Sequence, residues 1–192
     1  MTCIVSYIDK EDKKVWMASD TCISTSGGVK RVLSNPKIFK IKDADQKHEY
    51  LIGVSGDPKC QSLLQYSLEI PNRNETDINK FMHTEFVNSV IECLKVGLYS
   101  RNVNNVEEMD SHILVATDTG GIFCIEGNYQ VIKSVDKYYA SGSGTKIALG
   151  SLFTTKNLDL SAQDKTILAI ESAAEYETTV ALPMDIESIN II

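Results

Sequence analysis

The order of the predicted strands and helices constrains the fold of this chain more than any other feature. Runs rich in β-branched and aromatic residues predict strands, which cover residues 3–8, 15–19, 37–41, 49–54, 111–117, 122–126, 129–133, 138–140 and 186–189. Apolar spacing and start signals predict four helices, which cover residues 58–68, 81–94, 143–152 and a segment from 161. Because the strands follow one another in runs, we expect an α+β fold in which helices cover two mainly antiparallel sheets, as one domain over residues 1–192.

Two of the helices carry specific start signals. Asp57 is a good N-cap residue, and Pro58 is favoured at the first helical position. Ser161, followed three residues later by Asp164, resembles a capping box with aspartate in place of the usual glutamate. The polar stretches 24–28 and 101–110 are expected to be connections.

Composition excludes several classes of partner. The chain has 192 residues and a formal net charge of -7, so it offers no general attraction to nucleic acid or anionic lipid. Its five cysteines form no Cys-x-x-Cys pair, which favours a reduced, cytoplasmic protein. No apolar stretch approaches the roughly 18 residues that a membrane span needs. Protein or peptide partners are therefore expected.

The start of the chain carries a candidate nucleophile. Thr2 directly follows Met1. Once Met1 is removed, Thr2 has a hydroxyl and a free α-amine, and the ordinary amine pKa of about 7.7–8.0 suits a general base near neutral pH. Many proteins begin with Met-Thr without any catalytic role, so the position alone does not assign a function.

Three further residues could complete a site for acyl transfer. Asp20 ends the strand expected to pair with the one that begins behind Thr2, Lys37 precedes the apolar Ile38-Phe39, and Gly56 lies directly before the helix start at Asp57. Such chemistry needs a base, a positive charge and donors that face the developing oxyanion. Each residue also has an ordinary interpretation, as a turn aspartate, a solvated lysine and a turn glycine.

Taken in order, these segments resemble the proteasome β-type N-terminal nucleophile (Ntn) hydrolases, and most of all the bacterial HslV-type peptidases. The resemblance rests on five segments that cover nearly the whole chain, namely residues 1–5, 18–20, 37–41, 53–57, and 141–144 with 148–150. It implies a four-layer αββα sandwich. It also implies a threonine-type endopeptidase in a homo-oligomeric ring, with unfolded protein or peptide as substrate, an ATP-dependent unfoldase as partner and no required cofactor.

The resemblance also implies a role for each site residue. The Thr2 hydroxyl would attack the peptide carbonyl while the Thr2 amine accepts the proton. Lys37, held by Asp20, would lower the proton affinity of the nucleophile, and the Gly56 amide would stabilise the oxyanion. Ser143 would orient the Thr2 amine, although it could equally cap the helix that follows it. Substrate would lie as an extended strand against the residues Thr21, Ser24 and Gly56.

One loop departs from the family pattern. Where the family commonly has Asp and, three residues later, Ser or Thr, this chain has Glu177 and Val180, with Thr178 and Thr179 between them. The departure affects the support of the Thr2 amine and an implied monovalent-cation site, which carbonyls of Ala174, Glu177 and Val180 would form.

Two other functions remain open at this level. The departure and the presence of Met1 motivate a non-catalytic proteasome-like shell or interaction protein. A small-molecule amidohydrolase of the same nucleophile class would use the same threonine in a closed pocket. The three histidines lack metal-ligand spacing and receive no role in any of these hypotheses; they are His48, His83 and His112.

Overall fold

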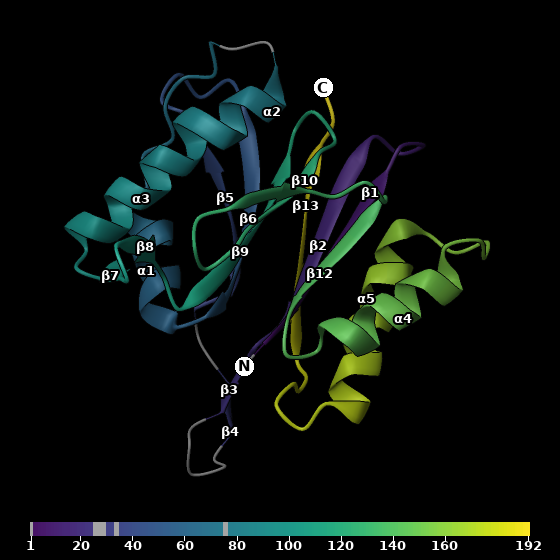
Figure 1. Cartoon of the computed structure of the whole chain (residues 1–192). Coiled ribbons are helices and arrows are strands. Elements are labelled where there is room, and N and C mark those ends of the chain that lie inside the picture. The colour runs from purple at the N-terminus through teal and green to yellow at the C-terminus, as the bar shows by residue number, and fades with distance from the viewer. Residues whose placement is uncertain (1, 25–29, 33–34, 75–76) are drawn as a thin grey trace.

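Two antiparallel sheets packed face to face form the centre of the molecule (Figure 1). The computed structural model describes residues 2–24, 30–32, 35–74 and 77–192. The first sheet has the order β12 (Tyr138–Gly142), β1 (Cys3–Asp9), β2 (Lys14–Asp20) and β13 (Met184–Asn190). The second has the order β11 (Val131–Lys133), β10 (Ile122–Ile125), β9 (Ser111–Thr117), β6 (Glu49–Gly56) and β5 (Ile38–Lys42).

Helices cover the outer face of each sheet. The first sheet is covered by α4 (Thr145–Thr155) and α5 (Ala162–Tyr176). The second is covered by α1 (Pro58–Ser67) and by a continuous helical segment made of α2 (Ile78–Phe81), the π-helical turn η1 (Met82–Phe86) and α3 (Val87–Val96). The layers therefore run helix, sheet, sheet, helix, which confirms the predicted αββα sandwich.

Both predicted helix starts are confirmed. The Asp57 side chain accepts a hydrogen bond from the Lys59 amide at 2.7 Å, with Pro58 at the first helical position. Ser161 Oγ accepts one from the Asp164 amide at 3.0 Å. The Asp164 carboxylate accepts a bond from the Ser161 hydroxyl itself at 2.7 Å. These bonds satisfy amides at the helix N-termini that would otherwise lack partners.

Apolar side chains fill all three interfaces between the layers. The core between the two sheets contains Ile4, Val15, Met17, Ile38, Leu51, Leu114 and Ile189, among others. One cluster lies under α1 and α3, and another lies between α4, α5 and the first sheet. Burial of this apolar area is the main favourable contribution to folding, at roughly 25 cal/mol per Å².

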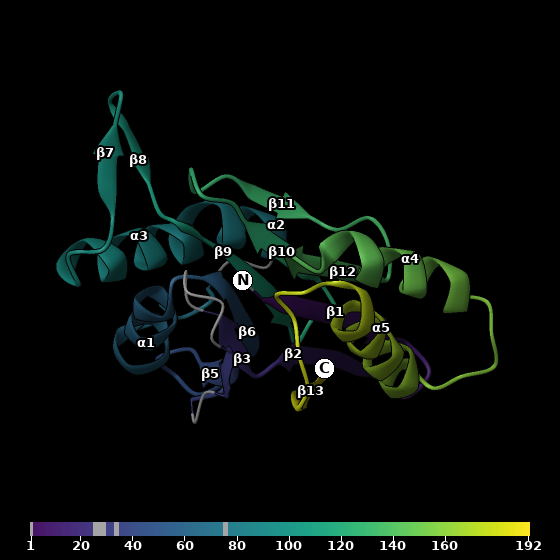
Figure 2. The ribbon, with the colours of Figure 1, turned by 90° about the horizontal axis from the view of Figure 1, so that it is seen from below.

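Two short hairpins are present outside the two main sheets. One lies within the predicted connection 101–110, whereas residues 25–28 of the predicted connection 24–28 lie outside the described residues. The pair β3 (Cys22–Ser24) and β4 (Lys30–Val32) follows β2, and the pair β7 (Arg101–Val103) and β8 (Val106–Glu108) follows α3. Figure 2 shows β7 and β8 projecting from the body of the molecule. Asn104 and Asn105 form the β7–β8 turn with φ of 51° and 64°, values that asparagine tolerates in hairpin turns. β7 and β8 have three residues each and are mostly polar, so they lack the alternation that reveals a strand.

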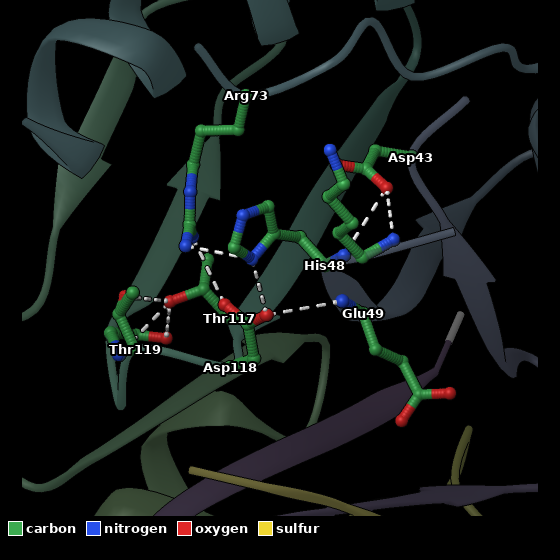
Figure 3. A network of polar contacts seen from close by, with 9 residues as sticks. Asp43, His48, Glu49, Arg73, Thr117, Asp118 and Thr119 are labelled. Atoms are coloured by element: carbon green, nitrogen blue, oxygen red, sulfur yellow. Dashed lines mark hydrogen bonds and ion pairs between the residues drawn. The ribbon is translucent and has the colours of Figure 1, made fainter. Parts of the chain in front are cut away.

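A polar network joins strands at one end of the sandwich (Figure 3). The buried Asp118 carboxylate, directly after β9, lies 3.0 Å from Arg73 Nη1 and 2.9 Å from His48 Nδ1. It also accepts a bond from the amide of Glu49, the first residue of β6. Because β6 runs antiparallel to β9, the last residue of β6, Gly56, pairs with the first residue of β9, Ser111, at the opposite end. That opposite end holds the candidate site.

Candidate active site

Thr2 lies at the open end of the sandwich, directly before β1, and only 3% of it is exposed. Its backbone nitrogen donates a hydrogen bond to Ser143 Oγ at 3.2 Å. Its carbonyl oxygen lies 3.3 Å from the same hydroxyl oxygen and accepts a bond from the Gly144 amide at 3.4 Å. Ser143 and Gly144, which follow β12, therefore bind both the nitrogen and the carbonyl oxygen of Thr2.

Gly142 makes this close approach sterically feasible. It has a φ of +97°, and a Cβ atom at this position would collide with the carbonyl of Thr2. Only glycine combines this backbone conformation with the lack of a side chain. In the antiparallel register Gly142 lies opposite Cys3, which places the following Ser143 beside Thr2.

Asp20 and Lys37 form a buried ion pair behind Thr2. Lys37 Nζ lies 2.9 Å from Asp20 Oδ1, and the two residues are 2% and 0% exposed. Asp20 Oδ1 also accepts a bond from the Cys3 amide at 2.9 Å, and Oδ2 one from the Cys22 amide at 3.3 Å. Lys37 Nζ donates a second bond to the Cys22 carbonyl. Burial lowers the pKa of Lys37, and the Asp20 carboxylate opposes this effect.

Ser143 connects Thr2 to a carboxylate. Its hydroxyl lies 2.7 Å from Thr179 Oγ1, and Thr179 donates a bond to Glu177 Oε1 at 2.8 Å. Bonds from the hydroxyl and the amide of Thr179 hold the pKa of Glu177 below its ordinary value of 4.5. Ser143 does not cap α4, because Gly144 is the N-cap and no side chain bonds there. The chain therefore has an acid and a hydroxyl in this loop, two residues apart rather than three.

Gly56 lies beside Thr2 on the second sheet. It is the last residue of β6, has a φ of +128°, and would place a Cβ atom 2.5 Å from the Asp110 carbonyl. Thr2 and Gly56 both line a cavity of about 440 Å³ on the β12 side. The same two residues line a much smaller cavity of about 10 Å³, which Ile23 and Lys37 also border. Gly56 therefore borders, together with Thr2, both cavities in which a substrate carbonyl could lie.

The adjacent cysteine is a poor competitor for the nucleophile role. Cys3 is completely buried, and burial together with Asp20 raises the pKa of its thiol to about 12. A thiol with such a pKa stays protonated near neutral pH and does not act as a nucleophile. All five cysteines are free.

The structure brings together five of the predicted site residues, namely Thr2, Asp20, Lys37, Gly56 and Ser143. Thr21 is close in the chain, but its amide and its hydroxyl both donate to the Pro183 carbonyl, at 3.1 and 2.8 Å. Ser24 is the last residue of β3. The substrate-binding role of Thr21 and Ser24 stays a prediction.

The implied cation site also stays a prediction. The Glu177 carbonyl already accepts a bond from the Val180 amide at 3.0 Å, and Val180 is buried. Ala174 belongs to the last turns of α5. Within the part of the chain that the structure describes, no group of three His, Cys, Asp or Glu residues could hold a metal ion.

Sequence reasoning missed two residues of the larger cavity. His112 and Glu126 line this cavity, and His112 Nδ1 lies 2.8 Å from a Glu126 carboxylate oxygen. His112 belongs to β9, and Glu126 lies directly after β10, fourteen positions further along the chain. Residues 111–117 and 122–126 are both predicted strands, and the pairing of β9 with β10 brings the two side chains together, but no motif marks either residue.

Comparison with known proteins identifies the class of fold. No protein-family model matches the sequence, and no curated protein matches it either. Solved structures do match over the whole chain, and the fold is that of the proteasome β-type Ntn hydrolases, in an HslV-like form. The sequence-based recognition of this fold is therefore confirmed.

Three of these structures show the range of similarity. BPH of Thiobacillus denitrificans in complex with epoxomicin is 22% identical, with a TM-score of 0.76 and 99% of each chain covered. The eukaryotic HslV of Trypanosoma brucei is 20% identical, with a TM-score of 0.67, covering 98% of this chain and 99% of that one. Anbu, an ancestral β-subunit from Yersinia bercovieri, is 12% identical, with a TM-score of 0.69, covering 99% of this chain and 82% of that one.

Proposed function

We propose that this chain is a threonine-type endopeptidase of a proteasome-like assembly, with Thr2 as the nucleophile after removal of Met1. One observation carries the proposal. Thr2 is the residue on which the Ser143 hydroxyl, the Asp20–Lys37 pair and Gly56 converge from four separate segments. Perturbed titratable groups gathered beside a cavity are typical of functional sites.

The proposed reaction begins at the Thr2 hydroxyl. Its oxygen attacks the carbonyl carbon of the peptide bond, and the free Thr2 amine accepts the proton, directly or through water. The amine then returns a proton to the leaving amine of the substrate, and water hydrolyses the ester. Ser143 accepts a hydrogen bond from the Thr2 nitrogen, so it can direct the lone pair of the freed amine towards the hydroxyl. The peptide nitrogen present before processing has no basic lone pair.

Two groups stabilise charge in this scheme. The Lys37 ammonium, fixed by Asp20, places a positive charge next to the nucleophile and lowers its proton affinity. The Gly56 amide donates to the oxyanion that forms on the substrate. Lys37 and Asp20 are buried, and this increases the strength of the Lys37 charge, because the local dielectric constant is lower than that of water.

A homo-oligomeric ring with a polypeptide substrate fits the exposed surface. Large apolar side chains remain exposed on both outer helical layers, among them Tyr66, Val96, Phe153 and Tyr176. Contact between subunits could cover these side chains. Solved structures of this fold include a helical assembly of Anbu from Pseudomonas aeruginosa. An ATP-dependent unfoldase is the proposed partner, and β3 offers an edge for an extended substrate strand.

A cytoplasmic location is part of the same proposal. All five cysteines are free. Among the described helices, none has the length and apolar character that crossing a membrane would require.

Activity of protein with a defined start tests the proposal. Protein that begins at Thr2 and protein that keeps Met1 should be compared on internally quenched peptides, with intact mass confirming each start. We expect turnover only when the chain begins at Thr2. A small amidohydrolase would cleave small amides but not these peptides. A non-catalytic shell protein would assemble without turnover from either start, and this result would contradict the proposal.

A further inference from the structure

The larger cavity beside Thr2 has a charge that the proposed reaction does not use. Its volume of about 440 Å³ falls in the range of roughly 300–1,000 Å³ that is typical of small-ligand sites. Among the described residues that line it, Glu126 is the sole Asp, Glu, Lys or Arg. The remaining lining is hydroxyl, glycine and aromatic, apart from His112, Cys124 and Ala140. The cavity therefore offers one carboxylate and no competing lysine or arginine.

The Glu126 carboxylate is held in place from two sides. His112 Nδ1 lies 2.8 Å from Oε2, and the Cys124 thiol donates to Oε1 at 3.4 Å. Cys124 is 2% exposed, and burial together with Glu126 raises the pKa of its thiol, so the thiol keeps its proton. The Glu126 side chain is still 29% exposed. A fixed carboxylate that retains access to solvent can bind a cation without rearrangement.

The larger cavity lies on the β12 side of Thr2, and the small cavity lies on the β3 side. Thr2 and Gly56 line both cavities, and the small one is bordered by Ile23 of β3. If the substrate segment before the scissile bond lies along β3, the segment after the bond continues past Thr2 on the other side. There the wall is formed by β12 with Ser143, and by Glu126 directly after β10.

We propose that this cavity receives the residue that follows the scissile bond, and that Glu126 selects a basic side chain, lysine or arginine, at that position. The inference rests on the proposed endopeptidase function for its place in the reaction, but the binding of a cationic group to the cavity does not depend on catalysis. An ion pair at a partly exposed site contributes up to about 1 kcal/mol, which corresponds to a preference of about fivefold.

Binding is tested first, without any turnover. Saturation-transfer difference NMR on the Thr2→Ala protein should compare lysine amide with norleucine amide, which has a similar length and no side-chain charge. We expect about fivefold tighter binding of lysine amide. This preference should disappear in Glu126→Gln, which keeps the shape of the side chain. It should persist in the matched control Glu108→Gln, since Glu108 of β8 does not line the cavity.

Cleavage is tested second, with internally quenched peptides that differ only at the residue after the scissile bond. For protein that begins at Thr2, kcat/KM should fall in the order lysine, norleucine, glutamate, and Glu126→Gln should remove about fivefold from the lysine-to-norleucine ratio. Equal rates for all three peptides would overturn the inference while leaving the endopeptidase proposal intact.

The two arms separate the possible failures. If no peptide is cleaved but lysine amide binds through Glu126, the endopeptidase proposal fails and the cationic site stands. Equal binding of the two amides to the folded Thr2→Ala protein overturns the site. Because this comparison uses two ligands on one protein, it decides the question even if Glu126→Gln does not fold.

Discussion

The Oδ1 atom of Asp20 accepts hydrogen bonds from Lys37 Nζ and from the Cys3 amide, each at 2.9 Å. One oxygen atom thereby connects the residue before β5 to the residue directly behind Thr2. This oxygen, together with the Cys22 carbonyl that also accepts a bond from Lys37, fixes the Lys37 charge relative to the start of the chain. Both the stability of the buried pair and the chemistry proposed for Thr2 depend on this carboxylate.

Removing the charge of Asp20 should destabilise the fold. In Asp20→Asn the Lys37 ammonium loses its buried counter-charge, and breaking such pairs typically costs about 3–5 kcal/mol. Urea denaturation should show a loss of this size. The control Glu187→Gln breaks the exposed Lys40–Glu187 pair, whose side chains are 39% and 47% exposed, and should cost less than about 1 kcal/mol.

The double variant Asp20→Asn with Lys37→Met should recover part of that loss. Without a buried ammonium there is no uncompensated charge, and apolar replacement of a buried pair is often close to neutral. Its free energy of unfolding should exceed that of Asp20→Asn alone, although it should be inactive. A double variant less stable than the single one would show that Asp20 acts mainly through its bonds to the backbone.

The contacts from Thr2 to Glu177 should affect the rate more than substrate binding. Thr179→Val removes the hydroxyl between Ser143 and Glu177 while keeping the size of the side chain. We expect kcat to fall about tenfold or more with KM nearly unchanged, because proton transfer contributes about 10²–10⁴-fold to catalysis. Steady-state kinetics should be compared with Thr154→Val, an exposed threonine of α4. Equal rates for the two variants would remove Thr179 from the mechanism.

Asp43 should stabilise the protein in a pH-dependent way. Burial raises the pKa of Asp43, but hydrogen bonds from the His48 and Lys47 amides outweigh this effect and hold the pKa below its ordinary 3.8. A depressed carboxyl pKa gives stability that is present above the unfolded value and is lost as pH falls through the folded value. Thermal unfolding of Asp43→Asn should therefore show a deficit at pH 7 that shrinks below about pH 4. A deficit of the same size at pH 3 would contradict this interpretation, and the exposed Asp45→Asn should show little effect at either pH.

Most of the fold follows from the sequence because the long strands and the helix caps are local signals. The strand pair β1–β2 and the helix starts at Asp57 and Ser161 are readable from a few adjacent residues. The hairpin of β7 and β8 is not, since its strands have only three residues each and are mostly polar. The helix predicted over 81–94 does continue through Met82 to Phe86, but the π-helical geometry of this turn has no local signal.

The site shows the same division between local and long-range information. Thr2, Asp20, Lys37 and Gly56 each carry a recognisable local context. The bond from Thr179 to Ser143 joins positions thirty-six residues apart, and the family spacing directed attention to Val180 instead. Val180 is buried, so the neighbouring threonine supplies the hydroxyl. Packing of the loop after α5 against β12 decides this, and no short motif encodes it.

Covalent labelling of the nucleophile tests the central claim most directly. Protein that begins at Thr2 should be incubated with a peptide epoxyketone, and the modified residue should be located by peptide mass mapping. We predict one adduct per chain on Thr2, and none in protein that keeps Met1 or in Thr2→Ala. Folded protein that begins at Thr2 but stays unlabelled, or that carries the label on another residue, would contradict the account.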